Sequence, residues 1–300
     1  MFQIGKALLL LTLSVGTLLS TAAGAAPSDT LVHVHGLAYS PDGSRILIPS
    51  HHGLAIYSDG KWSKAAGPEH DYMGFAVTRE FMYSSGHPAR DSGLTNPFGL
   101  IRSNDDGRTW TRLGLEGESD FHLLAASYET NTIYVYNPTP NSRMKAAGIY
   151  FTRNDGFTWQ RAAGKGLVGD PLSLAGHPTD PEVVALATRE GLFLSDDGGE
   201  GFDDVATGQT TAVSFDLDGT HLWYGGYDGT ATLHRFNRAS GETTAVNLPP
   251  LTNDAVAYFA QNPASHDEYA IATFKRNVFV SHDAGASWVA IARDGQGLDQ

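Results

Sequence analysis

Short apolar runs alternate with clusters of Gly, Asp, Asn and Ser along almost the whole chain after its first 30 residues. The runs are about four to eight residues long and rich in Val, Ile, Tyr and Phe, a pattern that is typical of β-strands. The first four strands are predicted at residues 33–40, 45–50, 53–58 and 61–65. The same succession of four strands continues to the end of the sequence, without a competing helical period.

A Ser/Thr-x-Asp/Asn-x-Gly-x-x-Trp/Phe motif marks the turn between the third and fourth strands. Its copies begin at Ser103, Thr152, Ser195 and Ser281, so that successive starts are 49, 43 and 86 residues apart. The last interval equals two periods of 43 residues, and the missing copy falls on a degenerate turn at residues 237–241. A truncated copy occupies residues 57–62. The repeat therefore predicts six units.

The motif has a structural explanation. Its Asp or Asn side chain accepts hydrogen bonds from the backbone of its own turn, its Gly supplies a positive φ, and its aromatic ring packs against the neighbouring unit. We therefore assign structural roles to Asp105, Gly107, Trp110, Asn154, Gly156, Trp159, Asp197, Gly199, Asp283, Gly285 and Trp288. Six such units predict an all-β fold, a six-bladed β-propeller of four-stranded antiparallel blades, which we favour over seven blades. The units end at the chain termini, so we expect no strand exchange at ring closure, although residues 27–32 could add to it.

The first 25 residues have the pattern of a secretory signal peptide. Lys6 precedes an apolar run, and small residues follow up to a cleavage site predicted near Ala25. Residues 26–300 then form a single propeller domain, which we expect to be periplasmic or secreted and not stably inserted in a membrane. The chain has no Cys and therefore no disulfide. Its net charge of −13 makes it a poor partner for nucleic acid.

Seven of the twelve histidines are predicted to meet at one mouth of the central channel. In a propeller, the innermost strand begins on the same face on which the turn between the second and third strands lies. This geometry gathers His33, His35, His51, His52, His70, His87 and His122 over three adjacent blades. We expect only one of His33 and His35 to face the channel, and we favour His35.

Imidazoles of this density, together with Asp71, Asp120 and Met73, are the ligands that copper or zinc requires. The preferred metal ligands are His35, His52, His70, His87 and His122. A polar pocket for a small substrate is the alternative interpretation of the same mouth.

The four turn motifs resemble the Asp boxes of the BNR-repeat superfamily, which includes sialidases, sortilin-type (VPS10) receptors and photosystem assembly factors. The segments His33-Val-His35-Gly36, Ser50-His51-His52-Gly53 and His70-Asp71-Tyr72-Met73 resemble exported bacterial propellers that are labelled sialidase-like glycosyl hydrolases. A sialidase would also need an arginine triad and a Tyr–Glu pair, and neither stands out in the sequence.

Three hypotheses about function follow. The first is an exported metal-binding propeller; if it hydrolyses a substrate, Asp71 or Asp120 is the expected base. The second is a sialidase-like glycoside hydrolase that uses Asp71, Glu118 and Asp120 as acid and base. The third is a non-catalytic scaffold or assembly factor. The expected partners are accordingly a metal ion, a small polar or glycan ligand, or another protein.

Overall fold

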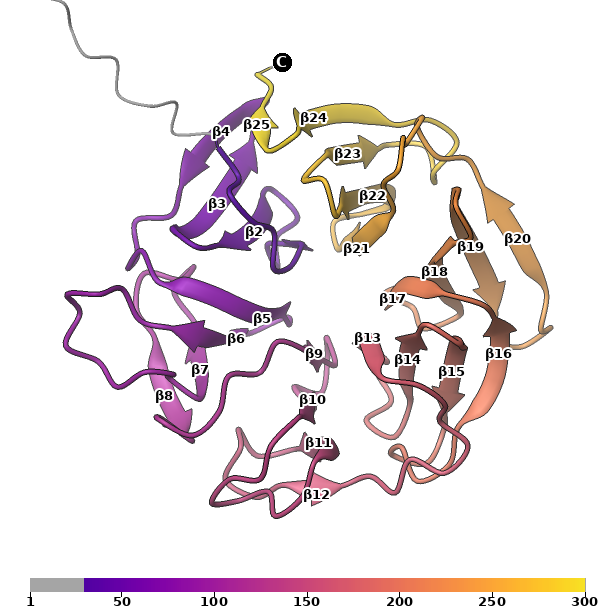
Figure 1. Ribbon diagram of the computed structural model, residues 1–300. Coiled ribbons are helices and arrows are strands. Elements are labelled where there is room, and N and C mark those ends of the chain that lie inside the picture. The colour runs from indigo at the N-terminus through magenta and orange to yellow at the C-terminus, as the bar shows by residue number, and fades with distance from the viewer. Residues whose placement is uncertain (1–29, 300) are drawn as a thin grey trace, which may run out of the picture.

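Each predicted unit folds into its own antiparallel sheet, and the six sheets are arranged radially in a ring (Figure 1). The structure, a computed structural model, describes residues 30–299. The predicted signal peptide, residues 1–25, lies outside the described residues. The described residues contain no helix, and so none that could cross a membrane. The expected six-bladed, all-β propeller is confirmed.

The strands follow in chain order. Blade one contains β1 (Ala38–Tyr39), β2 (Ile46–Ser50), β3 (Gly53–Ser58) and β4 (Lys61–Lys64); blade two contains β5 (Asp71–Val77), β6 (Met82–His87), β7 (Leu100–Ser103) and β8 (Thr111–Gly114). Blade three contains β9 (Leu124–Ala126), β10 (Ile133–Asn137), β11 (Gly148–Thr152) and β12 (Gln160–Arg161); blade four contains β13 (Pro171–Gly176), β14 (Val184–Thr188), β15 (Gly191–Ser195) and β16 (Asp203–Thr207). Blade five contains β17 (Thr210–Phe215), β18 (His221–Tyr227), β19 (Ala231–Asn237) and β20 (Thr243–Val246); blade six contains β21 (Val256–Asn262), β22 (Ser265–Thr273), β23 (Val278–Ser281), β24 (Val289–Arg293) and β25 (Gln296–Gly297).

The ring is closed by the segment that precedes β1. Thr30 forms an isolated antiparallel bridge with Gln296 of β25, and the backbone N–H of Leu31 donates to the carbonyl of Gly295 at 2.7 Å. No strand of blade one enters the sheet of blade six, as expected from the unit boundaries. The chain between residues 27 and 32 does add to the closure, through its described residues 30 and 31.

The four motif turns share one hydrogen-bond pattern. In the turn after β7, the Ser103 hydroxyl accepts from the backbone N–H of Gly107 at 3.0 Å, and the Asp105 carboxylate accepts from the N–H of Thr109 at 2.9 Å. The turns that start at residues 152, 195 and 281 repeat both contacts. Gly107 has a φ of 75°, where a side chain would be strained. These contacts agree with the structural roles predicted for the motif.

Apolar side chains pack between neighbouring blades rather than within one sheet alone. Trp110 of blade two packs against a buried cluster of Leu47 and Leu54 from blade one with Phe75 and Met82 from blade two. Full burial of each such apolar side chain contributes about 1.5–3 kcal/mol to the free energy of folding. This packing holds the innermost strands around a central cavity of about 230 Å³, which opens toward the predicted histidine mouth at His35.

Candidate metal centre at the channel mouth

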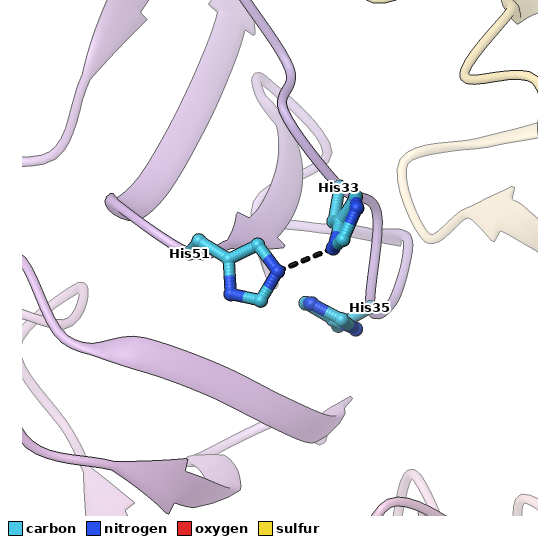
Figure 2. A group of neighbouring side chains, drawn as sticks. All are labelled: His33, His35 and His51. Carbon is cyan, nitrogen blue, oxygen red and sulfur yellow. Dashed lines mark hydrogen bonds between the residues drawn. The ribbon is translucent and has the colours of Figure 1, made fainter.

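Three histidines of blade one converge at the channel mouth (Figure 2). His33 and His35 lie on the segment that leads into β1, and His51 lies in the turn between β2 and β3. The backbone N–H of His35 donates to the carbonyl of Pro49 at 3.1 Å, which aligns this segment with β2. One ring nitrogen from each histidine lies within 4.8 Å of the other two. Nε2 of His51 directly contacts Nδ1 of His33.

Asp71, the first residue of β5, supports this group from blade two. Its Oδ2 lies 2.6 Å from Nδ1 of His51, so the His51 Nδ1–H donates to the carboxylate and its Nε2 is left to face His33. Its Oδ1 lies 3.8 Å from Nε2 of His35. Oδ1 of Asp71 and Nε2 of His35 are both buried and have no hydrogen-bond partner. Buried polar atoms normally have a hydrogen-bond partner, so this pair is a candidate position for a bound water or ligand.

Burial controls the charge of His35. Its removal from water lowers the pKa of His35 to about 4, against the opposing effect of the Asp71 carboxylate, and the neighbouring His51 and His33 lower it further. The ring is therefore neutral at neutral pH, and a neutral imidazole nitrogen is the form that binds metal.

A second group lies on the next two blades. Asp120 Oδ2 is 2.7 Å from Nε2 of His122 and 3.1 Å from Nε2 of His87. Nδ1 of His87 in turn contacts Oδ1 of Asn96 at 2.7 Å. The hydrogen bond to Asp120 raises the pKa of His122, against the opposing effect of burial. Asp120 Oδ1 remains buried without a partner.

Two preferred ligands are placed away from both groups. His52 is exposed beside His51. His70 is buried, accepts the backbone N–H of Ala89 at Nδ1 and packs against the rings of Tyr72 and Phe98. Its pKa is lowered by burial.

The structure places the two remaining candidates, Met73 and Glu118, outside both groups. Met73 is buried within β5. Glu118, proposed as a catalytic carboxylate, accepts the N–H and hydroxyl of Ser142, and these bonds lower its pKa. Of His33 and His35, only His35 lines the central cavity, as favoured from the sequence, whereas both histidines line a groove between blade six and blade one.

A further group, not predicted from the sequence, lies where β17 leads into β18 and consists of Asp216, Asp218 and His221. The buried Asp216 accepts from Trp223 Nε1 at 2.6 Å and from the Arg235 guanidinium at 2.9 Å. Because a cation and an indole already satisfy this carboxylate, the group is explained by a hydrogen-bonded ion-pair network.

Comparison with known proteins supports the fold alone. No protein-family model matches the chain, and no curated protein matches it. Among solved structures, the GH74 enzyme of Niastella koreensis superposes with a TM-score of 0.61 at 15% identity, covering 88% of this chain and 46% of that one. The propeller in a nidogen/laminin complex gives 0.59 at 12% identity, with 82% and 91% covered, and YCF48 bound to a D1 peptide gives 0.51 at 14% identity, with 88% and 82% covered. The chain thus spans about half the length of the GH74 enzyme.

Proposed function

We propose that this propeller binds one transition-metal ion, zinc or copper, through His33, His35 and His51, with Asp71 orienting the ligands. The observation that carries the proposal is the convergence of three imidazoles beside a buried, unpartnered pair of atoms, Nε2 of His35 and Oδ1 of Asp71. Ligand atoms held about 2.1 Å from a tetrahedral metal lie about 3.4 Å apart. One ring nitrogen from each of the three proposed ligands lies within 4.8 Å of the other two, which is the scale of this spacing.

The contact between His51 and Asp71 has the form that metal-binding histidines commonly show. A carboxylate that accepts one ring N–H fixes the ring and raises the basicity of the opposite nitrogen. In His51 that opposite nitrogen is Nε2, which points at His33. In the absence of a metal, Nε2 of His51 and Nδ1 of His33 contact each other. A bound metal would instead accept a lone pair from each of these two nitrogens.

The donor set favours zinc or copper(II). All three proposed ligands are imidazoles, which suit both ions, and three protein ligands leave a further coordination position open. His35 also lines the central cavity, so a metal held by it would lie beside the channel. A metal bound here would supply a Lewis acid at the mouth, and Asp120, whose Oδ1 is buried without a partner in the second group, is a candidate proton acceptor.

The resemblance of the turn motifs to Asp boxes and the predicted signal peptide extend this proposal. We infer that the chain is a BNR-type propeller that acts after export, where its metal is acquired outside the cytoplasm. Cell fractionation that finds the processed chain in the periplasm or medium supports this part, and retention of the full-length chain in the cytoplasm contradicts it.

The metal content of the purified protein tests the central claim. Protein loaded with zinc or copper(II) and freed of excess metal should contain one ion per chain by mass spectrometry. His51→Ala should lose most of this metal, and so should His33→Ala. His52→Ala is the matched control, because it removes an exposed imidazole from the same turn. Substoichiometric metal in the wild type, or equal loss in His51→Ala and His52→Ala, rules the site out.

A further inference from the structure

A groove of about 620 Å³ runs between blade six and blade one, directly beside the proposed metal centre. His33 and His35 line it on one side, and Tyr258, Phe274, Lys275 and Arg276 line it from blade six. His35 also lines the central cavity, so the groove and the channel meet at this imidazole. A ligand lying in the groove therefore reaches the open side of the metal centre.

The wall from blade six is a turn equivalent to the one that carries His51. Residues 274–276 connect β22 to β23, just as His51 and His52 connect β2 to β3. In a propeller these turns lie on one face, so neighbouring blades supply the two sides of the mouth. Blade one supplies imidazoles, whereas blade six supplies an aromatic ring and two cations.

The two cations of this turn lack acidic partners. Nζ of Lys275 donates to the carbonyl of Thr252 at 2.9 Å, and the Arg276 guanidinium donates to the carbonyl of Val32 at 3.0 Å. Neither forms an ion pair within the described part of the chain, although the protein has 33 acidic and only 20 basic residues. Asp294 is the one carboxylate among the described residues that line the groove. Two cations therefore line the groove together with one carboxylate.

The same turn offers an apolar surface. Phe274 is 63% exposed, an unusual state for a large aromatic side chain, and it lines both the groove and the central cavity. Tyr258 lines both as well. An aromatic ring that is accessible and lies next to cations suits a ligand with a flat or apolar body and a charged group.

We infer that the groove binds a small organic anion, a carboxylate or a phosphate with an apolar body, and directs its charged group toward the metal. The inference rests on the proposed metal centre and adds the class of ligand. Lys275 attracts and holds the anionic group, Phe274 contacts the apolar body, and the metal takes an oxygen of the anion. Arg276 has a second role, because its bond to Val32 also positions the segment that carries His33.

Calorimetric titration of the zinc-loaded full chain with benzoate and with phenyl phosphate tests this inference. Both anions should bind, and neutral benzyl alcohol should bind at least tenfold more weakly. Lys275→Glu should weaken anion binding at least tenfold while zinc stays at one per chain. Arg189→Glu is the matched control, because this exposed cation lies in the equivalent turn of blade four, between β14 and β15. It should bind both anions like the wild type.

The outcomes separate the two proposals. The proposed anion site is overturned if the wild type and Lys275→Glu bind the anions equally well. It is also overturned if the wild type binds benzyl alcohol as tightly as the anions, or binds neither anion. If the wild type takes up no zinc, the metal centre fails on its own. The same titration of metal-free protein then decides the groove: anion binding that Lys275→Glu abolishes supports it, and absence of binding overturns it.

Discussion

Replacing Asp71 by Asn tests whether this carboxylate supports a metal centre or merely pairs with histidines. The substitution keeps the shape of the side chain, which is 21% exposed, and removes its charge. The amide oxygen can still accept from Nδ1 of His51, where the carboxylate now accepts at 2.6 Å. The amide nitrogen would lie near Nε2 of His35 and donate to it, which occupies a lone pair that the metal needs.

The size of the effect follows from the lost contact. A hydrogen bond to a charged group contributes about 1.5–3 kcal/mol, and removal of such support from a metal ligand weakens metal binding about 10- to 100-fold. At a free metal concentration of about 100 times the wild-type Kd, the ion stabilises the fold by about 2.7 kcal/mol. A Kd raised about 30-fold reduces this to about 0.9 kcal/mol, which lowers Tm by several degrees.

Thermal unfolding with and without zinc, at one fixed free zinc concentration, measures this difference. Asp71→Asn should lose most of the rise in Tm that zinc gives the wild type, while its Tm in chelator should change less. Asp218→Asn is the control, since this exposed carboxylate belongs to the group in the turn between β17 and β18. A zinc-dependent rise in Asp71→Asn equal to that of the wild type would refute the supporting role.

Two further predictions concern the fold and its response to pH. Gly74→Ala should destabilise the protein by about 3 kcal/mol or more in urea unfolding, because the new Cβ would lie 2.2 Å from the carbonyl oxygen of Phe121. Gly201→Ala is the control: its Cβ would meet only a side-chain oxygen at 3.5 Å, so this change should destabilise the protein by about 1 kcal/mol or less. The pKa of His35 is about 4 in the folded protein and about 6.5 when unfolded, so the unfolded state binds the extra proton between these values. In metal-free protein, the contribution of His35 to stability should therefore fall by about 3 kcal/mol between about pH 6.5 and about pH 4. His35→Gln, compared with the wild type by urea unfolding at pH 7 and pH 4, should lack this contribution. An unchanged pH dependence in His35→Gln would contradict the assignment.

The fold was predictable because its repeating information is local. The motif turns close hydrogen bonds between residues no more than four apart, so their pattern survives in the sequence without knowledge of the neighbours. Strand ends were less predictable. The inner strand of blade one was predicted at residues 33–40, but β1 covers only Ala38–Tyr39. The inner strand of blade three is also short, and β9 covers only Leu124–Ala126. Phe121 instead bonds to blade two, where its N–H donates to Ser85 and its carbonyl accepts from Gly74. Such contacts between blades leave no local pattern.

The candidate site was predictable in its location but not in its membership. Topology alone gathers the histidines of three blades at one mouth, and the structure divides them into two groups and two separate residues. Adjacent residues such as His51 and His52 point in different directions, and the conformation of one turn decides which enters the site. His70 has a structural role instead, because its Nδ1 accepts a hydrogen bond from the backbone N–H of Ala89. These choices depend on backbone geometry that residue type does not encode.

The construction of the site links metal binding to the closure of the ring. His51 is carried by a turn of blade one, but His33 and His35 belong to a segment that the last blade holds in place. The guanidinium of Arg276 in blade six donates to the carbonyl of Val32, next to the first of these ligands. A metal that binds all three histidines requires this segment to be docked, and a ligand that binds only the docked state stabilises it. The proposed centre therefore lies where the first and last blades of the propeller meet, and its ion would strengthen this junction.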